Sequence, residues 1–344
     1  MISRRAFLAR SGTLTAGLTA WPGGFTYAQA LATYFNWESP IKGVRFARGG
    51  GGASLVVSSG GESLLVDCKR YGLGTTLRRE VESDTTTLVA VVNTHHHRTQ
   101  SGGNFAFTPD LPVIAQRRAA RRILSSANGV LESLRENTEG DIIARHRQLV
   151  ADMAYSTEGA GAALSDFDAH VATLDDIVAG NFGPTVIFDE SYTGRVGDLD
   201  FELYHFGRAH TDNDLVVWVP GLDVMHVGNL VEVDAHPLID VGRGGNIRSW
   251  QSYLRRVLPI VGPQTLLLPS DGELVASVHD IEAQIEYFDR LRGLAQGAID
   301  AGMSRQETVD FIPTTNLGRF SGLARPELLA TNLGIVYDEL DIGR

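Results

Sequence analysis

Apolar residues recur along the chain in short β-prone runs, and polar or glycine-rich turns separate these runs. In the first half they predict strands at Ser54–Ser58, Ser63–Asp67, Thr87–Asn93 and Pro112–Ala115. A helix is expected around Gln116–Ala127. Between Leu164 and Val178, apolar residues at i, i+3, i+7, i+10 and i+14 predict one face of another helix.

The second half repeats this alternation of strands and helices. Its predicted strands are Thr185–Asp189, Asp200–Phe206, Asp214–Val219, Val224–Val227 and Thr265–Leu268. One helix is expected from near Asn246 to residues 261–262, and another from Val275 to Ala298 with an apolar stripe along it. A doubled pattern of this kind predicts two sheets face to face with helices outside, an α/β sandwich of four layers. We expect one domain over residues 31–344, ending in a helical cap at about 304–344.

Composition narrows the classes of protein that the chain can represent. Its 344 residues are 43% hydrophobic and 21% charged, which is an ordinary globular balance. The formal net charge is -11, and without residues 1–30 it becomes -14, with 27 basic against 41 acidic side chains. Such an acidic surface argues against nucleic-acid or anionic-membrane partners. A single cysteine, Cys68, excludes an intrachain disulfide. The oligomeric state is not predicted.

The first thirty residues have the features of an export signal. Ser3–Leu8 contains two adjacent arginines followed by Ala-Phe-Leu, a short apolar stretch runs from Gly12 to Trp21, and Ala28–Ala30 has an A-x-A cleavage pattern. The segment resembles a bacterial twin-arginine signal, which implies export of a folded protein to the periplasm. The apolar stretch is too short to span ~30 Å of hydrocarbon, so no transmembrane anchor is expected after removal. The alternative interpretation is a basic amphipathic helix of the folded domain.

Three histidines follow predicted strands at positions suited to one metal ion. His95 and His97 lie in a loop directly after an apolar strand, and residues two apart in extended backbone point the same way. His210 lies in Gly207–Thr211, between two further predicted strands. Three imidazoles with a vacant fourth position are the ligand set in which zinc lowers the pKa of bound water to about 7 and provides hydroxide.

Four ordered motifs resemble those of the metallo-β-lactamase superfamily. They are T-H-x-H-x-D-H-x-G-G at Asn93–Asn104, G-x-x-H-T at Gly207–Thr211, an apolar residue before G-D at Val227–Asn229, and P-G-H-G near Leu268–Gly272. The resemblance covers roughly residues 44–300. It implies an αβ/βα sandwich with a first metal site built from His95, His97 and His210, which we expect to hold one zinc ion.

The second metal site of that superfamily is largely replaced here. The resemblance places its four ligand positions at Thr99, Gln100, Asn229 and Asp271, and of these only Asp271 carries a charge. A second tightly held metal is therefore not expected. The missing motif aspartate normally orients the attacking water, which predicts weak hydrolysis. Asn229 also argues against an iron oxygenase, whose ligands are two histidines and a carboxylate.

Two functional hypotheses follow. The first is a mono-zinc, hydrolase-like enzyme acting on a small molecule, with Asp271 as catalytic base or auxiliary ligand. The second is a catalytically inactive periplasmic member of the same fold that binds a ligand or partner in this cleft. Asp271 could equally be an ion-pair partner, and Thr99 and Gln100 could line a substrate pocket or stabilise their loop. His96 and Arg98 are expected to face outer carboxylates or solvent, and His226 or His236 could replace a lost ligand. The sequence carries no signature of the substrate.

Overall fold

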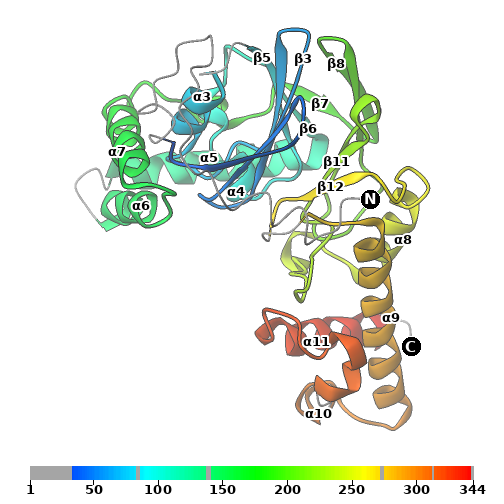
Figure 1. The fold of residues 1–344 in the computed structure, drawn as a ribbon. Helices are drawn as coiled ribbons and strands as arrows, with labels where there is room; N and C mark the ends of the chain where they lie inside the picture. The colour runs from blue at the N-terminus through cyan, green and yellow to red at the C-terminus, as the bar shows by residue number, and fades with distance from the viewer. Residues whose placement is uncertain (1–32, 83–85, 137–140, 272–274, 312–313, 342–344) are drawn as a thin grey trace.

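The chain folds around two β-sheets that lie face to face (Figure 1). A computed structural model describes residues 33–82, 86–136, 141–271, 275–311 and 314–341. The first sheet has the order β1-β2-β3-β4-β5-β6-β7. Its strands are β1 (Asn36–Ile41), β2 (Val44–Arg48), β3 (Ser54–Ser59), β4 (Glu62–Val66), β5 (Thr87–Asn93), β6 (Val113–Gln116) and β7 (Val186–Phe188).

The second sheet has the order β12-β11-β10-β9-β8. Its strands are β8 (Ser191–Val196), β9 (Leu199–Tyr204), β10 (Val216–Val219), β11 (Val224–Gly228) and β12 (Leu266–Pro269). Strands β4 to β7 run parallel to one another, and so do β11 and β12. Because parallel strands end at the same edge of a sheet, the loops after β4, β5, β11 and β12 can meet in one place.

Helices cover the outer faces of both sheets. The helices of the described residues are α3 (Gly74–Glu82), α4 (Arg98–Ser101), α5 (Arg117–Glu136), α6 (Asp141–Asp152), α7 (Thr157–Ala172), α8 (Ile247–Val257), α9 (Val278–Asp300), α10 (Arg305–Phe311) and α11 (Glu327–Asp341). Short 3-10 turns lie at Asn104–Ala106, Ala179–Phe182, Pro220–Leu222, Val241–Arg243 and Thr314–Phe320.

Three apolar layers hold the sandwich together. Leu64 and Val66 of the first sheet pack against Val217 and Leu268 of the second, and these side chains are fully or almost fully buried. The opposite face of the first sheet packs on α3 and α7, and that of the second on α8 and α9. Alternating residues of each strand thus face different layers, as the period of an extended chain requires. The predicted four-layer α/β sandwich is confirmed.

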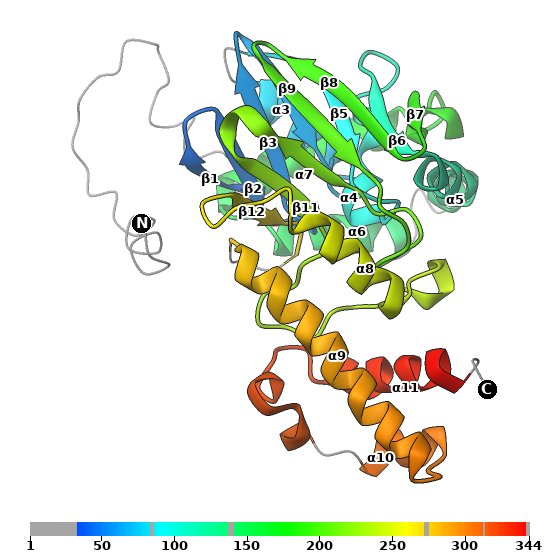
Figure 2. The same ribbon diagram turned by 90° about the vertical axis from the view of Figure 1, so that its right-hand side faces the viewer.

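The last helices form a separate group beside the lower half of α9 (Figure 2). Helix α11 packs against both α9 and α10. Among the described residues, no helix combines the length and apolar character that a membrane crossing requires. The predicted signal at residues 1–30 lies outside the described residues, and the boundary at 304 remains a prediction.

Several element predictions need correction. The strand expected at Thr185–Asp189 is β7, but it pairs with β6 and completes the first sheet. The helix expected up to Val178 is α7, which ends at Ala172; Leu174 is still buried, whereas Val178 is 61% exposed. The sequence prediction also omitted β1, β2, β8, α3 and α6. Strand β8 alternates exposed and half-buried residues at a sheet edge, so it lacks a strong apolar pattern.

Candidate metal centre

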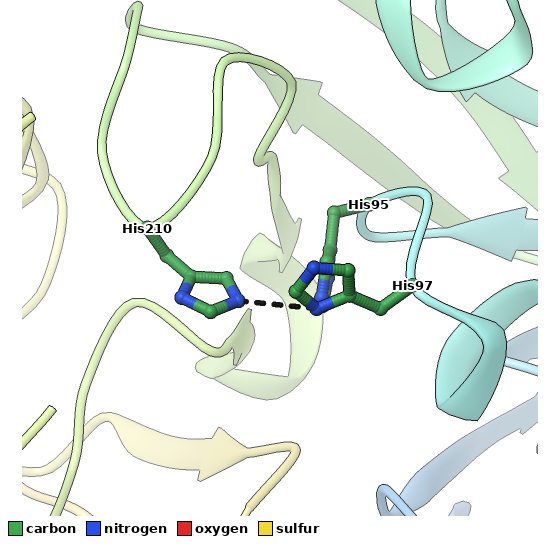
Figure 3. A group of neighbouring side chains, drawn as sticks. All are labelled: His95, His97 and His210. Carbon is green, nitrogen blue, oxygen red and sulfur yellow. Dashed lines mark hydrogen bonds between the residues drawn. The ribbon is translucent and has the colours of Figure 1, made fainter. Parts of the chain in front are cut away.

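The three predicted histidines come together at the edge where β5 ends (Figure 3). One candidate ligand atom from each of His95, His97 and His210 lies within 4.8 Å of the others. Strand β5 ends at Asn93, so its buried backbone delivers His95 to this edge, and α4 begins directly after His97. His210 arrives from the loop between β9 and β10. His95 and His210 are almost completely buried, whereas the side chain of His97 is 25% exposed.

Each ring is oriented by a hydrogen bond on its outer nitrogen. His97 Nε2 lies 2.9 Å from Asp240 Oδ2, and His210 Nδ1 lies 2.7 Å from the backbone oxygen of Leu238. His95 Nδ1 lies 3.1 Å from Thr94 Oγ1. Thr94 Oγ1 itself donates to Asp67, so its oxygen can accept a hydrogen bond from His95 Nδ1–H. The outer nitrogens therefore carry the protons, which leaves lone pairs on the inner nitrogens.

Burial and the outer hydrogen bonds favour neutral rings whose inner nitrogens carry lone pairs. Burial lowers the pKa of His95 well below its usual value, and burial also lowers the pKa of His97 and His210. The rings are thus neutral at pH 7. His97 Nδ1 and His210 Nε2 nevertheless lie 3.3 Å apart, and the buried His95 Nε2 has no hydrogen-bond partner among the described residues. Lone pairs that converge on one point repel one another, and a cation bound between them would remove this repulsion.

A second group of candidate ligands shares His97. It consists of His96, His97 and Asp240. In this group Asp240 already contacts His97 Nε2 and accepts the backbone N–H of Arg243 at 3.0 Å. His96 Nδ1 lies 3.1 Å from the side-chain nitrogen of Asn213. These contacts make Asp240 an orienting partner of His97. The carboxylate that we expected near His96 therefore contacts His97 instead.

Thr99, Gln100, Asn229 and Asp271, the positions at which the sequence resemblance predicts a lost second metal site, form a hydrogen-bonded row, here called the polar row. Thr99 Oγ1 donates to Gln100 Oε1, and Gln100 Nε2 donates to Asn229 Oδ1 at 3.3 Å. Asn229 Nδ2 in turn donates to Asp271 Oδ2 at 2.7 Å. The side-chain amides of Gln100 and Asn229 thus link these positions by direct hydrogen bonds, whereas carboxylate ligands at these positions would need a cation between them. Asp271 lies at the end of the polar row, and its role as base or ligand stays a prediction.

Beneath the cluster, Asp67 fixes the loop that carries His95. Its oxygens accept the Thr94 backbone N–H and hydroxyl, both at 2.8 Å, and the Ser270 hydroxyl at 3.2 Å. Burial raises the pKa of Asp67 to about 7. Gly228 closes the other side: its φ is +53°, and a Cβ there would lie 3.1 Å from Thr94 Cβ. A side chain at this position would therefore press on the loop.

Sequence reasoning missed Leu238 and Asp240 in the segment 229–240, and these residues supply two of the three outer partners. Residues 324–332, near the C-terminus, hold this segment in place through hydrogen bonds and an ion pair. Ala324 exchanges backbone hydrogen bonds with it, at 2.8 Å to Asp234 and 2.9 Å to His236. Asn332 Nδ2 donates to the Pro237 oxygen at 2.9 Å, and Arg325 pairs with the buried Glu232. Burial raises the pKa of Glu232 to about 7. His236 Nδ1 is hydrogen-bonded to the Tyr287 hydroxyl, so His236 does not belong to the histidine cluster.

Replacing Asp240 by asparagine should weaken zinc binding. The Asp240→Asn variant keeps a side-chain oxygen near His97 Nε2 but removes its charge, so the ring is held less firmly and is a weaker ligand. Loss of such an outer partner lowers metal affinity about 10–100-fold. Competition titration with a zinc-binding dye measures this change. Asp234→Asn is the matched control, because Asp234 is exposed in the same segment. An equal loss in both variants would contradict the role given to Asp240.

Replacing Asn332 by alanine should affect the metal centre from a distance. The Asn332→Ala variant leaves the buried Pro237 oxygen without its donor, which costs about 1–3 kcal/mol of stability. It also loosens Leu238, which orients His210, so zinc affinity falls as well. Tyr337→Phe removes another hydrogen bond of α11, from Tyr337 to the Met303 oxygen. Zinc titration of both variants checks the prediction; unchanged affinity in Asn332→Ala would refute it.

Comparison with known proteins identifies the fold. No protein-family model matches the chain. A segment of 80 residues is 25% identical to metallo-β-lactamase type 2 of Bacillus cereus, and 96 residues are 24% identical to metallo-β-lactamase IND-1 of Chryseobacterium indologenes. These segments cover 23% and 28% of this chain. They span only 31% and 40% of the relatives' own lengths.

Solved structures match over a much longer stretch. A metallo-β-lactamase from Pontibacter korlensis superposes with a TM-score of 0.52 and 16% identity, over 74% of this chain and 99% of its own. The metallo-β-lactamase DIM-1, in a crystal exposed to ceftazidime, gives a TM-score of 0.52 and 12% identity over 75% and 98%. The chain therefore has the metallo-β-lactamase fold, with a histidine cluster suited to a metal ion at one edge of the sandwich.

Proposed function

We propose that this protein is a mono-zinc hydrolase that acts on a small molecule at the cluster of His95, His97 and His210. The observation that carries the proposal is the convergence of three ring nitrogens, one from each histidine, while the other nitrogen of each ring is hydrogen-bonded. Neutral imidazoles whose other nitrogen bonds a carboxylate or carbonyl are the usual form of zinc ligands. The residues present thus fit a zinc ion.

A zinc ion held by three histidines would supply Lewis-acid chemistry and a hydroxide nucleophile near neutral pH. The protein's own contribution is to keep the imidazoles neutral and fixed. Burial of His95 and His210 favours their uncharged forms, and Asp240 and the Leu238 carbonyl fix two of the rings. The side chain of His97 is partly exposed, so a substrate could approach the cluster from this side.

Asp271 is the proposed base or auxiliary ligand. It lies half-buried at the end of the polar row, and one oxygen accepts the Asn229 amide. It is close enough to His210 for its charge to raise the pKa of that ring, against the larger effect of burial. A carboxylate so placed can hold a proton that leaves the nucleophile or enters the leaving group.

The test is a hydrolysis screen of the purified chain with β-lactam, thioester, lactone and phosphodiester substrates. We expect turnover of at least one class, lost with a chelator and restored by zinc. Asp271→Asn should lower kcat about 10²–10⁴-fold with zinc content unchanged, as for loss of an acid–base group. A chain that binds zinc and turns over none of these substrates would favour the second candidate, an inactive binding protein. Replacement of the second site by the polar row motivates that candidate.

We further propose that residues 1–30 form a twin-arginine signal and that the mature protein acts in the periplasm as one domain with a helical cap from about residue 304. The paired arginines and the A-x-A sequence at Ala28–Ala30 support export. Cell fractionation checks this proposal. An Arg4→Lys, Arg5→Lys variant should remain in the cytoplasm at full length, and periplasmic recovery of that variant would exclude the twin-arginine route.

A further inference from the structure

A cavity of about 810 Å³ is lined by Arg208, two residues before His210, and by none of the three clustered histidines. Its lining residues come from the start of α5, the residues after β7, the end of β9 and the loop that follows it, and α8. Five arginines line it, and together they define the arginine cleft: Arg117, Arg118, Arg121, Arg208 and Arg256. Its volume lies in the range of small-molecule sites, about 300–1,000 Å³.

The charge of the arginine cleft is opposite to that of the chain. The whole sequence carries a net charge of -11, yet only two acids, Asp189 and Glu190, line this cavity with the five arginines. Arg117 neutralises Asp189 through two hydrogen bonds of 2.6 and 2.9 Å. The hydrogen bond from Arg117 lowers the pKa of Asp189, and the charge of Arg121 lowers it further. Arg256 forms no ion pair with a carboxylate among the described residues. A concave, positive surface on an acidic protein concentrates small anions.

The shape of the cleft also suits recognition. Arg256 lies 4.2 Å from the ring centre of Phe206, which holds its guanidinium plane in place. Phe206 in turn stacks on Tyr204, with ring centres 5.4 Å apart and planes at 17°. Both rings line the cleft. A guanidinium group binds carboxylate or phosphate with two parallel hydrogen bonds, and an aromatic wall accepts the apolar part of the same molecule.

The cleft and the cluster share one loop. Arg208 precedes His210 by two residues and donates to the Gly244 oxygen at 2.7 Å. On the other side of this loop, Arg118 reaches the backbone oxygen of Asp212 at 3.4 Å. Strands β9 and β11 both run antiparallel to β10, so they end at the same edge of the sheet. A molecule in the cleft therefore lies along the edge that carries the histidines.

We infer that the arginine cleft binds a small aromatic or partly apolar anion through its phosphate or carboxylate group and so defines the substrate class of this protein. The assignment of a substrate rests on the proposed function, whereas anion binding itself does not. Binding to the cleft needs neither zinc nor any of the three histidines.

Isothermal titration of the metal-free chain with phenyl phosphate and with phthalate, at low ionic strength, tests this inference. We expect at least one of them to bind, with affinity that falls as salt is added, and the two arms distinguish phosphate from carboxylate recognition. Arg121→Glu with Arg256→Glu should weaken binding at least about tenfold. Arg145→Glu with Arg248→Glu makes the same charge change on exposed helix positions outside the cleft and should have a much smaller effect.

His95→Ala separates this inference from the proposed function. If the variant binds the anion as the unaltered chain does, the cleft is the site, whatever the outcome of the hydrolysis screen. Loss of anion binding in His95→Ala would overturn the inference, because the anion would then depend on the histidine cluster. Equal weakening in both double-arginine variants, or no binding of either probe by the unaltered chain, would also overturn it.

Discussion

His210→Ala is expected to reduce bound zinc from about one ion per chain to almost none. Two histidines would remain, and the loss should exceed the ~10–100-fold change in affinity that follows removal of an outer partner. His210 suits this experiment because it belongs only to the group with His95 and His97, whereas His97 also belongs to the group with His96 and Asp240. Elemental analysis after gel filtration, together with dye competition, measures the change.

A matched variant controls for the loss of a buried ring. His170 is buried in α7, where its Nε2 lies 2.6 Å from the Tyr71 hydroxyl. His170→Ala should lower the melting temperature but retain zinc. His210→Gln, which keeps more of the side-chain volume, serves if His210→Ala does not fold. Full zinc content in a folded His210 variant would show that the ion binds elsewhere or not at all.

The second large effect is the gain of a metal ion. Replacing Thr99 by aspartate, Gln100 by histidine and Asn229 by aspartate should raise zinc binding from one ion to two per chain, with Asp271 completing the site. The four side chains already contact one another in sequence, so ligands at these positions start within reach of a common centre. Without a metal, the two added carboxylates next to Asp271 repel one another, and the variant should be less stable than the unaltered chain.

Thr99→Asn with Gln100→His is the control, because it adds an imidazole but no carboxylate. It should still bind one ion. Zinc titration followed by elemental analysis distinguishes the two variants, and a melting temperature that rises more steeply with zinc in the triple variant supports the second site. A triple variant that folds and still holds one ion would show that Gln100 and Asn229 are not placed as second-site ligands.

The sequence predicted the parts of the site that depend on local order. His95 and His97 directly follow a continuous apolar strand, and their alternation along an extended loop is visible in the sequence. His210 lies in a glycine-containing loop between two strands, which is also a local pattern. The four-layer arrangement follows from the alternation of strands and helices. These features can be predicted without knowing which loops lie close together in the folded protein.

The outer partners depend on packing across the whole fold and could not be predicted in the same way. Asp240 is 143 residues from His97, and the Leu238 carbonyl has no side-chain signal at all. Asn332 acts on the same segment from α11 through one amide. The membership of β7 in the first sheet was missed for a similar reason, because pairing with β6 is decided by the fold and the strand itself has only three residues.

Anomalous diffraction at the zinc absorption edge, from crystals of the zinc-loaded chain, tests the central claim most directly. We predict one peak per chain, bounded by His95 Nε2, His97 Nδ1 and His210 Nε2 at the ~2.0–2.1 Å typical of zinc–imidazole bonds. A peak between His96, His97 and Asp240, or no peak near these side chains, would contradict the account.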